Sequence, residues 1–357
     1  MNTKFHFRLD ASAIIGLGHL YRCLALADYA VTHNIQSFFY IRTTTNNNFD
    51  LIQKHNHSLV FLSESNQLSK IDLADENHSL TDWLGATQKE DSEEFLLKSL
   101  PLRKNCSQNI IIVDHYGIEP TWEKSVRKHF DCYIKLCDSP EKNIGTIADI
   151  IIDQTAGRQT IDYSSIGFSN PCILAGQDFV LLSPKYISLN EAEFSHKLST
   201  ECKLKILVSF GGTDPLNLNS RFLKLVANEN PTFEYIVATG SSNAHLNNLK
   251  QTISHLTQKN ISIQLMINGD MPNLLSSCHT AVGAAGNSSW ERAYLGVPSI
   301  VVPFEENQKD IAHFLQSNEC AISVDLSNFN EINRQFNYLS KDQHLRKRFT
   351  ENSMKLI

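Results

Sequence analysis

The residues with the clearest potential for chemistry surround a short loop near the N-terminus. Arg8, Asp10 and Ser12 precede the segment Gly16-Leu-Gly18-His19, and the apolar residues after it recur at helical spacing. This pattern predicts that the glycines make a tight turn and that His19 begins a helix. The positive potential of a helix N-terminus disfavours the imidazolium form, so a neutral His19 can accept a proton as a general base.

A Gly-x-Gly segment before a helix is weak evidence by itself. The dinucleotide-binding fingerprint needs a third glycine, and Tyr21 stands at that position, which disfavours a dinucleotide cofactor. A purely structural interpretation makes Gly16 and Gly18 turn residues and His19 a helix-start side chain bonded to the backbone. The charged and polar side chains around the same turn, Arg22 among them, favour the functional interpretation.

A second polar loop follows the strongly apolar segment 110–113. Asp114, His115 and Tyr116 stand directly after that segment. Polar side chains at the carboxyl end of a buried parallel strand point toward the ligand of the sheet. Tyr116 can therefore donate to or orient a sugar or a water molecule, whereas Asp114 can equally cap a turn.

A glycine pair in the second half predicts a phosphate site. Gly211, Gly212 and Thr213 follow the apolar segment 205–209, and two glycines let backbone amides approach a phosphate closely. No Gly-Lys-Ser/Thr sequence accompanies them, so the hydrolysis of a nucleoside triphosphate has no support. A bare turn between a strand and a helix is the alternative for this loop taken alone.

The segment that begins at Gly286 is more specific. Gly286 turns the chain, and Asn287, Ser288 and Ser289 supply a cap and backbone amides at a helix start, where an anion binds readily. Glu291 lies one turn into this helix and is placed to accept hydroxyl hydrogen bonds, as from a ribose. A capped surface helix is the structural alternative.

The next predicted helix begins with Asn307 and Gln308, which can reach the same ligand, although Asn307 can also be a plain N-cap. No Asp, Glu and His cluster at metal-ligand spacing accompanies these loops, and the eight cysteines contain no Cys-x-x-Cys pair. Asp214, the nearest carboxylate, is expected to cap a helix rather than to bind magnesium. We therefore expect no metal and no cofactor.

Short apolar segments of strand length alternate with amphipathic segments of helical length along the whole chain, which predicts an α/β fold. The charged segment 189–203 is followed at once by a fresh strand and marks a domain joint near residues 185–203. We expect a Rossmann-like domain over residues 1–188, a second over 203–335, and a C-terminal helix over 336–357 that packs across the joint. The predicted strands are 5–9, 37–41, 59–62, 110–113, 133–136, 150–152, 205–209, 235–238, 261–266, 280–282, 299–302 and 321–324.

Composition excludes several classes of protein. The 357 residues carry 32 Lys plus Arg against 38 Asp plus Glu, a formal charge of -6, so no broad basic surface for nucleic acid is expected. The N-terminus has no basic and apolar regions of a signal peptide, and the apolar runs are shorter than the ~20 residues of a membrane helix. We expect a cytoplasmic protein without a membrane anchor; its oligomeric state is not predicted.

Taken together, these motifs resemble a known family. FRLDASAIIGLGHLYRCLALA is similar to the signature RxDxSxxIGxGHxxRxLxLA of the UDP-2,4-diacetamido-2,4,6-trideoxy-β-L-altropyranose hydrolases of pseudaminic acid biosynthesis. VDHYGI, DWLGATQKED, VSFGGTDP and AGNSSWERAYLGVPSIVV, with a following ENQ, resemble further blocks of that family. The resemblance covers most of residues 4–320. The second half is also similar to the nucleotide-sugar half of the lipid II-forming N-acetylglucosaminyltransferase.

The resemblance implies a glycosyltransferase-B (GT-B) type fold, with two Rossmann-like domains facing a cleft and UDP held mainly by the second. It implies metal-independent hydrolysis with cleavage of the C1–O bond and anomeric inversion. His19 is then the base that activates water, with Tyr116 beside it. The UDP contacts fall on Gly211, Gly212, Thr213, Asn287, Ser288, Ser289 and Glu291, and the substrate contacts on Arg8, Asp10, Ser12, Gly18, Asp114, Asn307 and Gln308.

We therefore expect hydrolysis of a UDP-linked 2,4-diacetamido-2,4,6-trideoxyhexose to free sugar and UDP. Two alternatives stay open: a UDP-hexosamine glycosyltransferase, in which His19 activates an acceptor hydroxyl, and a catalytically silent nucleotide-sugar-binding protein. The chain departs from the family pattern at Cys137-Asp138, where many members have two aspartates, at Ser183, where they have arginine, and at Asn287, where they have glycine. These departures bear on sugar specificity more than on the reaction.

Overall fold

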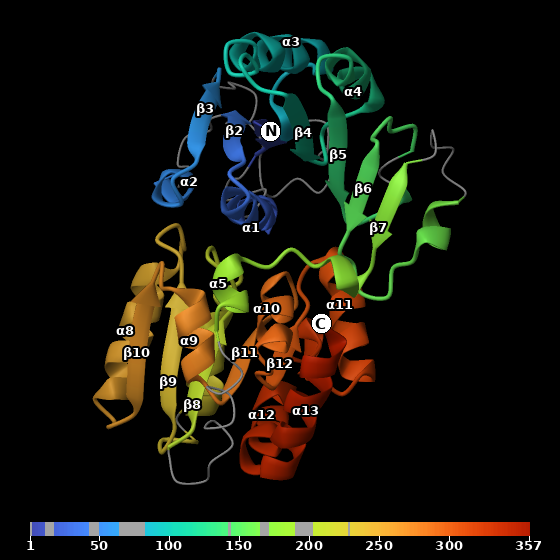
Figure 1. Ribbon diagram of the computed structural model, residues 1–357. Coiled ribbons are helices and arrows are strands. Elements are labelled where there is room, and N and C mark those ends of the chain that lie inside the picture. Colours follow the sequence, from blue (N-terminus) through green and yellow to red (C-terminus); the bar gives the residue numbers. More distant parts are fainter. Residues whose placement is uncertain are drawn as a thin grey trace. The chain divides into compact units, whose positions relative to one another are not determined.

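The computed structural model describes residues 2–10, 18–42, 50–63, 83–141, 144–164, 171–189, 203–227 and 229–357. The chain divides into two compact units, Met1–Pro184 and Lys185–Ile357, and each unit contains one parallel sheet (Figure 1). The α/β class predicted from the sequence is thus confirmed. Most of the predicted joint segment, residues 190–202, lies outside the described residues.

The sheet of the first unit has the strand order β3-β2-β1-β4-β5-β6-β7, and all neighbours are parallel. Side chains from both faces are buried, as expected for a parallel sheet that is covered by helices on both sides. The strands are β1 (Thr3–Leu9), β2 (Gln36–Arg42), β3 (Ser58–Leu62), β4 (Gln108–Asp114), β5 (Cys132–Cys137), β6 (Ile150–Asp153) and β7 (Cys172–Ala175).

Helices cover both faces of this sheet. The helices α1 (Gly18–Thr32) and α2 (Asp50–Lys54) pack on one face, through an apolar cluster that includes Leu24 and Ile52. The helices α3 (Gln88–Ser99) and α4 (Pro120–Arg127) pack on the other face, through Phe95 and Trp122. Short 3₁₀ turns lie at Thr160–Tyr163 and Gln177–Phe179.

The sheet of the second unit has the order β10-β9-β8-β11-β12-β13 and is also parallel. Its strands are β8 (Lys205–Ser209), β9 (Glu234–Thr239), β10 (Ser262–Ile267), β11 (Thr280–Ala284), β12 (Ser299–Val302) and β13 (Ala321–Ser323). Its helices are α7 (Leu218–Phe222, continued by a π turn over Leu223–Ala227), α8 (Leu246–Thr257), α9 (Met271–Ser277), α10 (Ser288–Tyr294), α11 (Glu306–Ser317), α12 (Ile332–Lys341) and α13 (Gln343–Leu356). The short helix α5 (Pro184–Ile187) lies at the boundary of the units, and a 3₁₀ turn over Leu326–Glu331 precedes α12.

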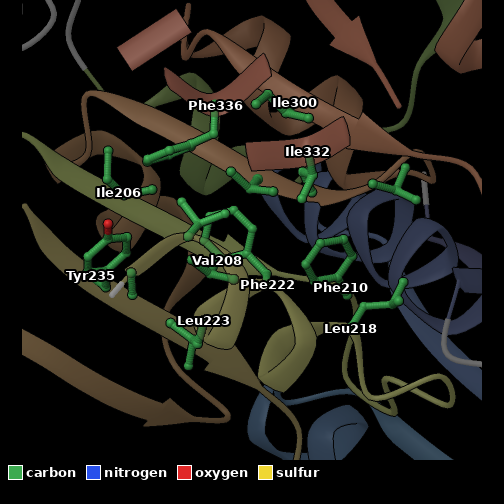
Figure 2. Close-up of a cluster of buried hydrophobic side chains, with 14 of the residues drawn as sticks. Ile206, Val208, Phe210, Leu218, Phe222, Leu223, Tyr235, Ile300, Ile332 and Phe336 are labelled. Atoms are coloured by element: carbon green, nitrogen blue, oxygen red, sulfur yellow. The ribbon is translucent and has the colours of Figure 1, made fainter. Parts of the chain in front are cut away.

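The main core of the second unit joins the strands to α7, α8 and α12. Figure 2 shows this cluster, in which Val208 of β8 and Ile300 of β12 lie among aromatic side chains from the helices. The rings of Phe222 and Phe336 meet edge to face, with centroids 5.5 Å apart. A second cluster, with Tyr186 of α5 and helix α9, covers the opposite face of the sheet. The central strands β8 and β11 are therefore buried on both faces.

The strand orders create a switch point in each sheet. After β1 the chain continues to β2 on one side, and after the neighbouring β4 it continues to β5 on the other side. The pair β8 and β11 repeats this arrangement in the second unit. Ligands of open α/β sheets bind beyond the carboxyl ends of strands at such points. The four polar loops noted in the sequence follow these four strands.

Each of the twelve predicted strands corresponds to a strand of the structure, whereas β7 was not predicted. Its four residues, Cys-Ile-Leu-Ala, are as apolar and as many as those of β6, so the local pattern does not explain why this strand was missed. The polar, helically periodic C-terminal stretch forms α12 and α13, both in the second unit. None of the described helices is long and apolar enough to cross a membrane.

Candidate functional site

The centre of the first-unit site is a hydrogen bond between His19 and Asp114. His19 lies in the first turn of α1, as predicted, and Asp114 is the last residue of β4. The distance from Nδ1 of His19 to Oδ1 of Asp114 is 2.6 Å, and both side chains are buried. Burial alone would raise the pKa of Asp114, but Arg22 and His19 hold it well below its usual range.

The ionised carboxylate determines which nitrogen of His19 can act as a base. Because Asp114 can only accept hydrogen bonds, Nδ1 of His19 carries a proton and donates it to Asp114. In the neutral ring Nε2 is then the acceptor, and no described residue is hydrogen-bonded to it. A carboxylate that fixes the tautomer of a catalytic histidine in this way is the arrangement used by many general bases.

Arg22 completes this cluster one turn further along α1. Its guanidinium donates to both oxygens of Asp114, with Nε at 2.5 Å from Oδ2. Its Nη2 also lies 3.1 Å from Nδ1 of His19. Asp114 therefore orients His19 and neutralises Arg22, which explains why three polar side chains can share a buried position.

Tyr116 packs against His19 and is bonded to a second carboxylate. The ring centroids of Tyr116 and His19 are 4.7 Å apart, in an edge-to-face arrangement. The hydroxyl of Tyr116 donates to Oδ2 of Asp138, the residue that follows β5. Burial, and then the charge of Asp138, raises the pKa of Tyr116 well above its usual value. Tyr116 is thus a protonated side chain held beside the histidine.

Arg8 and Asp10 lie deeper in the first unit than His19 does. Arg8 is fully buried and pairs with Asp91 of α3 at 2.7 Å and with Asp10 at 2.8 Å. Nε2 of His115 donates to Asp10 over 2.9 Å, because its Nδ1 accepts a hydrogen bond from the backbone of Gly117. These contacts join the C-terminal end of β1 to the residues that follow β4. A direct contact of Arg8 or Asp10 with the substrate stays a prediction.

Two residues of the first loop lie outside the described part of the chain and a third lies within it. Ser12 lies outside the described residues, as does Gly16. Gly18 is the first residue of α1, directly before His19. The structure therefore brings His19, Asp114 and Tyr116 together and sets Gly18 beside them.

In the second unit the loop after β8 contains the predicted glycine pair. Gly211 has a φ of 96°, a conformation that side-chain-bearing residues rarely adopt, and open space surrounds the position of its missing Cβ. The backbone oxygen of Gly212 accepts a hydrogen bond from the amide of Gly240 at 2.9 Å. Thr213 follows, half-buried. The loop is thus fixed at one end of β9 and accessible over Gly211.

Asp214 caps the helix that follows this loop. Its carboxylate accepts hydrogen bonds from the backbone amides of Leu218 and Asn219, at 2.8 and 3.1 Å. Burial raises its pKa, and the amides partly oppose this effect. Asp214 thus bonds to the first turn of α7 as a cap does, although Asn217 stands at the N-cap position. Among the residues that the structure describes, no group of three or more His, Cys, Asp or Glu side chains is arranged to hold a metal ion.

The loop after β11 leads into α10 through Gly286 and Asn287. Asn287 does not cap the helix through its side chain, contrary to the sequence-based expectation, because its backbone is already helical. The amides of Ser289 and Trp290 bond to the backbone oxygens of Gly286 and Asn287, at 2.8 and 3.0 Å. The turn is therefore closed by its own backbone.

Glu291 lies in the first turn of α10 and is half-buried. Burial raises its pKa to about 7, although a hydrogen bond with Tyr186 of α5 opposes this effect. A carboxylate in such a position gains from further hydrogen-bond donors, such as the two hydroxyls of a ribose. A contact between Glu291 and a ribose stays a prediction.

The predicted residues of α11 are only partly described. The helix begins at Glu306, so the two predicted residues, Asn307 and Gln308, stand in its first turn. The side-chain oxygen of Gln308 accepts a hydrogen bond from the amide of Phe304 over 3.2 Å, which holds the loop before the helix. The side chain of Asn307 lies outside the described part of the chain. Ligand contacts of Asn307 and Gln308 therefore stay predictions.

The second unit matches a known family model. Residues 206–355 match the model described as "Glycosyltransferase family 28 C-terminal domain". This range begins within β8 and ends within α13, so it spans both glycine loops and α10.

Two curated relatives match most of the chain. "Uncharacterized protein MJ1062" of Methanocaldococcus jannaschii is 25% identical over 306 residues, 84% of this chain. The chain spans only 56% of the length of that relative. The UDP-2,4-diacetamido-2,4,6-trideoxy-β-L-altropyranose hydrolase of Campylobacter jejuni is 24% identical over 239 residues, 66% of this chain and 81% of its own.

Solved structures match the whole chain at low identity. The crystal structure of MurG from Acinetobacter baumannii gives a TM-score of 0.65 at 13% identity and covers 99% of this chain and 95% of its own. UDP-GlcNAc 2-epimerase from Neisseria meningitidis, bound to UDP-GlcNAc, gives 0.59 at 14% identity, with 99% and 96% covered. The fold is of the GT-B type. The fold predicted from the resemblance is thus confirmed.

Three residues of this GT-B protein are joined to the predicted sites but were not among the predicted contacts. Arg22 and Asp138 contact Asp114 and Tyr116, respectively, and Arg292 contacts both serines of α10. Arg22 was noted in the sequence as a charged side chain near this turn, and it lies one helical turn after His19 on the same face. Nothing in the local sequence shows that Asp138 reaches Tyr116, because that contact joins two strands.

Proposed function

We propose that the protein hydrolyses a UDP-linked 2,4-diacetamido-2,4,6-trideoxyhexose, with the β-L-altropyranose as the first substrate to test. The observation that supports this proposal most is the His19 and Asp114 pair, in which the carboxylate holds Nδ1 and leaves Nε2 as an acceptor. A binding protein has no need for an oriented base. The glycosyltransferase domain match of the second unit and the hydrolase relative from Campylobacter jejuni support a nucleotide-sugar substrate.

In the proposed reaction Nε2 of His19 removes a proton from a water molecule. The water oxygen forms a bond to C1 of the sugar, the C1–O bond to the diphosphate breaks, and UDP leaves with the bonding electrons. Asp114 stabilises the imidazolium that forms, and Arg22 keeps that carboxylate ionised. Tyr116, protonated and beside the ring, would orient the water or the sugar.

The second unit would hold the UDP. Backbone donors of the open Gly211 loop are suited to phosphate oxygens, and Glu291 is suited to the ribose hydroxyls. Donors that are already in position stabilise the charge of the leaving group without reorganisation.

Incubation of the purified protein with the UDP-sugar alone tests this proposal. Hydrolysis predicts equal amounts of UDP and free sugar without any acceptor. The main competing function is transfer to an acceptor, which is favoured by the same glycosyltransferase domain match. Tight binding of the UDP-sugar without release of UDP would instead indicate a silent binding protein, and release of UDP only after an acceptor is added would indicate a transferase.

Replacement of Glu291 by alanine should weaken UDP binding by about 1–3 kcal/mol, because ribose hydroxyls would lose a buried acceptor. Calorimetry with UDP measures this loss. Since the pKa of Glu291 is about 7, UDP affinity of the unmodified protein should also fall as the pH is lowered through 7. Glu291→Gln should remove that pH dependence.

The matched control for this variant is Glu319→Ala. Glu319 is exposed, two residues past the C-terminal end of α11, and among the described residues its carboxylate pairs with the exposed Arg348. UDP affinity should be unchanged in this control. A ribose role for Glu291 is wrong if Glu291→Ala binds UDP as tightly as the control does.

Turnover should not need a divalent metal ion. Asp214, the carboxylate nearest to the glycine pair, is already bonded to two backbone amides. The diphosphate charge must then be met by backbone and side-chain donors of the second unit. Activity should persist in EDTA. Activity that vanishes on chelation and returns with magnesium would contradict this account and direct attention to Asp114 and Asp138.

A further inference from the structure

Arg292 is a buried arginine in α10 that the proposed reaction does not yet use. Its side chain is 2% exposed and runs back toward the end of β11. Nη2 donates to the backbone oxygen of Ala284 at 2.6 Å and to Oγ of Ser289 at 2.8 Å, and Nη1 donates to Oγ of Ser288 at 3.2 Å. One guanidinium thus joins the last residue of β11 to the first two residues of α10.

The neighbouring strand leaves room for this guanidinium because residue 283 is a glycine. A Cβ at Gly283 would lie 3.1 Å from Nη1 of Arg292 and only 2.0 Å from the backbone oxygen of Ser209. Gly283 and Ser209 are paired across β11 and β8. The position of Arg292 therefore depends on close packing at the point where the two nucleotide loops begin.

The partners of Arg292 differ from those of the other deeply buried arginines. Arg8, Arg22 and Arg42 each pair with at least one aspartate. The hydrogen-bond acceptors of Arg292 are two hydroxyls and one carbonyl, and within the described ranges it forms no ion pair and its Nε has no partner. Burial lowers its pKa to about 10, so it stays charged at neutral pH.

A buried cation without a paired anion is unfavourable unless an anion binds near it. The carboxylate nearest in sequence is Glu291, and its charge only partly opposes the lowering of the pKa of Arg292 by burial. Burial also raises the pKa of Glu291 itself, to about 7. Ser288 accepts from Arg292, so its hydroxyl hydrogen remains to be donated to another group. The serine would therefore present a donor with a positive charge directly behind it.

We propose that Arg292 is the counter-charge of the nucleotide site and acts on the diphosphate of UDP through Ser288. It is a positioning residue, since its guanidinium is held by protein oxygens and does not contact the ligand. This inference rests on the proposed function, because it takes UDP as the ligand of the second unit. It adds the source of the positive charge that the glycine loops lack.

The test compares binding of UDP and of uridine, which lacks the phosphates, by calorimetry. In Arg292→Met we expect UDP affinity to fall by about 10-fold to 100-fold, as for the loss of a charge-assisted hydrogen bond, while uridine affinity changes by less than about 2-fold. Arg292→Lys, which keeps the charge but not the three contacts, should lose less. Ser288→Ala should reproduce most of the loss seen in Arg292→Met.

The double variant Ser288→Ala with Arg292→Met should bind UDP no more than about 2-fold more weakly than Arg292→Met alone. Wild-type UDP affinity in Arg292→Met, equal losses for UDP and uridine, or fully additive losses in the double variant would overturn the proposal. If Arg292→Met does not fold, Ser288→Ala alone tests the proposal. Unchanged UDP affinity in Ser288→Ala would then overturn the proposal. Absence of UDP binding by the unmodified protein would instead defeat the proposed function itself.

Discussion

Replacement of His19 by asparagine is expected to lower kcat by about 10²-fold to 10⁴-fold, because the amide keeps a polar side chain but removes the proton acceptor. The nitrogen that accepts the proton is Nε2, because Nδ1 donates to Asp114. UDP affinity should change little, since we propose that the second unit holds UDP. Steady-state turnover of the UDP-sugar and calorimetry with UDP measure the two effects separately.

The matched control is His33→Asn. His33 is exposed just beyond the C-terminal end of α1, the helix that His19 begins. This control should keep wild-type kcat. Turnover by His19→Asn within a few fold of the control would refute the assignment of the base.

The second large effect is expected for Asp114→Asn. An asparagine amide can donate to Nδ1 of His19, which moves the ring proton to Nε2 and removes the acceptor that water needs. We expect kcat to fall by about 10²-fold or more. Arg22, buried beside position 114, would lose its carboxylate, so the free energy of unfolding should also fall by about 3–5 kcal/mol.

Glu123→Gln separates these two effects. Glu123 is a buried carboxylate of the same unit and pairs with the buried Lys135 at 2.6 Å, so its loss should also destabilise the protein. Its turnover, measured below the unfolding temperature, should stay near wild type. The orienting role of Asp114 is wrong if Asp114→Asn and Glu123→Gln lose stability equally and both retain kcat.

Much of the fold follows from local patterns in the sequence. Segments such as Ile110–Val113 and Lys205–Ser209 are apolar, short and followed by glycine or aspartate, and each forms a central strand. The strand β7 was not predicted, although its four residues are apolar and pair with β6. Its position at the edge of the sheet does not explain this miss, because the edge strands β3, β10 and β13 were all predicted.

The site was only partly predictable. His19 and Tyr116 stand out because loops that follow neighbouring parallel strands meet at one edge of a sheet. The partners that determine their chemistry come from distant segments: Asp114 is 95 residues from His19, and Asp138 is 22 residues from Tyr116. A single sequence does not contain these pairings, since they arise from the order of the strands.

The predicted side-chain cap by Asn287 was wrong for a similar reason, because it depended on a backbone conformation that the sequence does not show. An asparagine before a helix is a common cap, but here the backbone at this position is helical and the turn is closed by hydrogen bonds from Ser289 and Trp290. Arg292, which the sequence presents as one charge on a surface helix, supplies the side-chain contacts to both serines instead. Burial of that arginine could be learned only from the packing of α10 against β11.

The most direct test of the central claim is turnover of the UDP-sugar in ¹⁸O-labelled water, with mass analysis of both products. If His19 activates water for attack at C1, the label enters the sugar and the released UDP carries none. Label in the β-phosphate of UDP would show cleavage of the P–O bond, and no release of UDP without an acceptor would show transfer. Either result would contradict hydrolysis at C1.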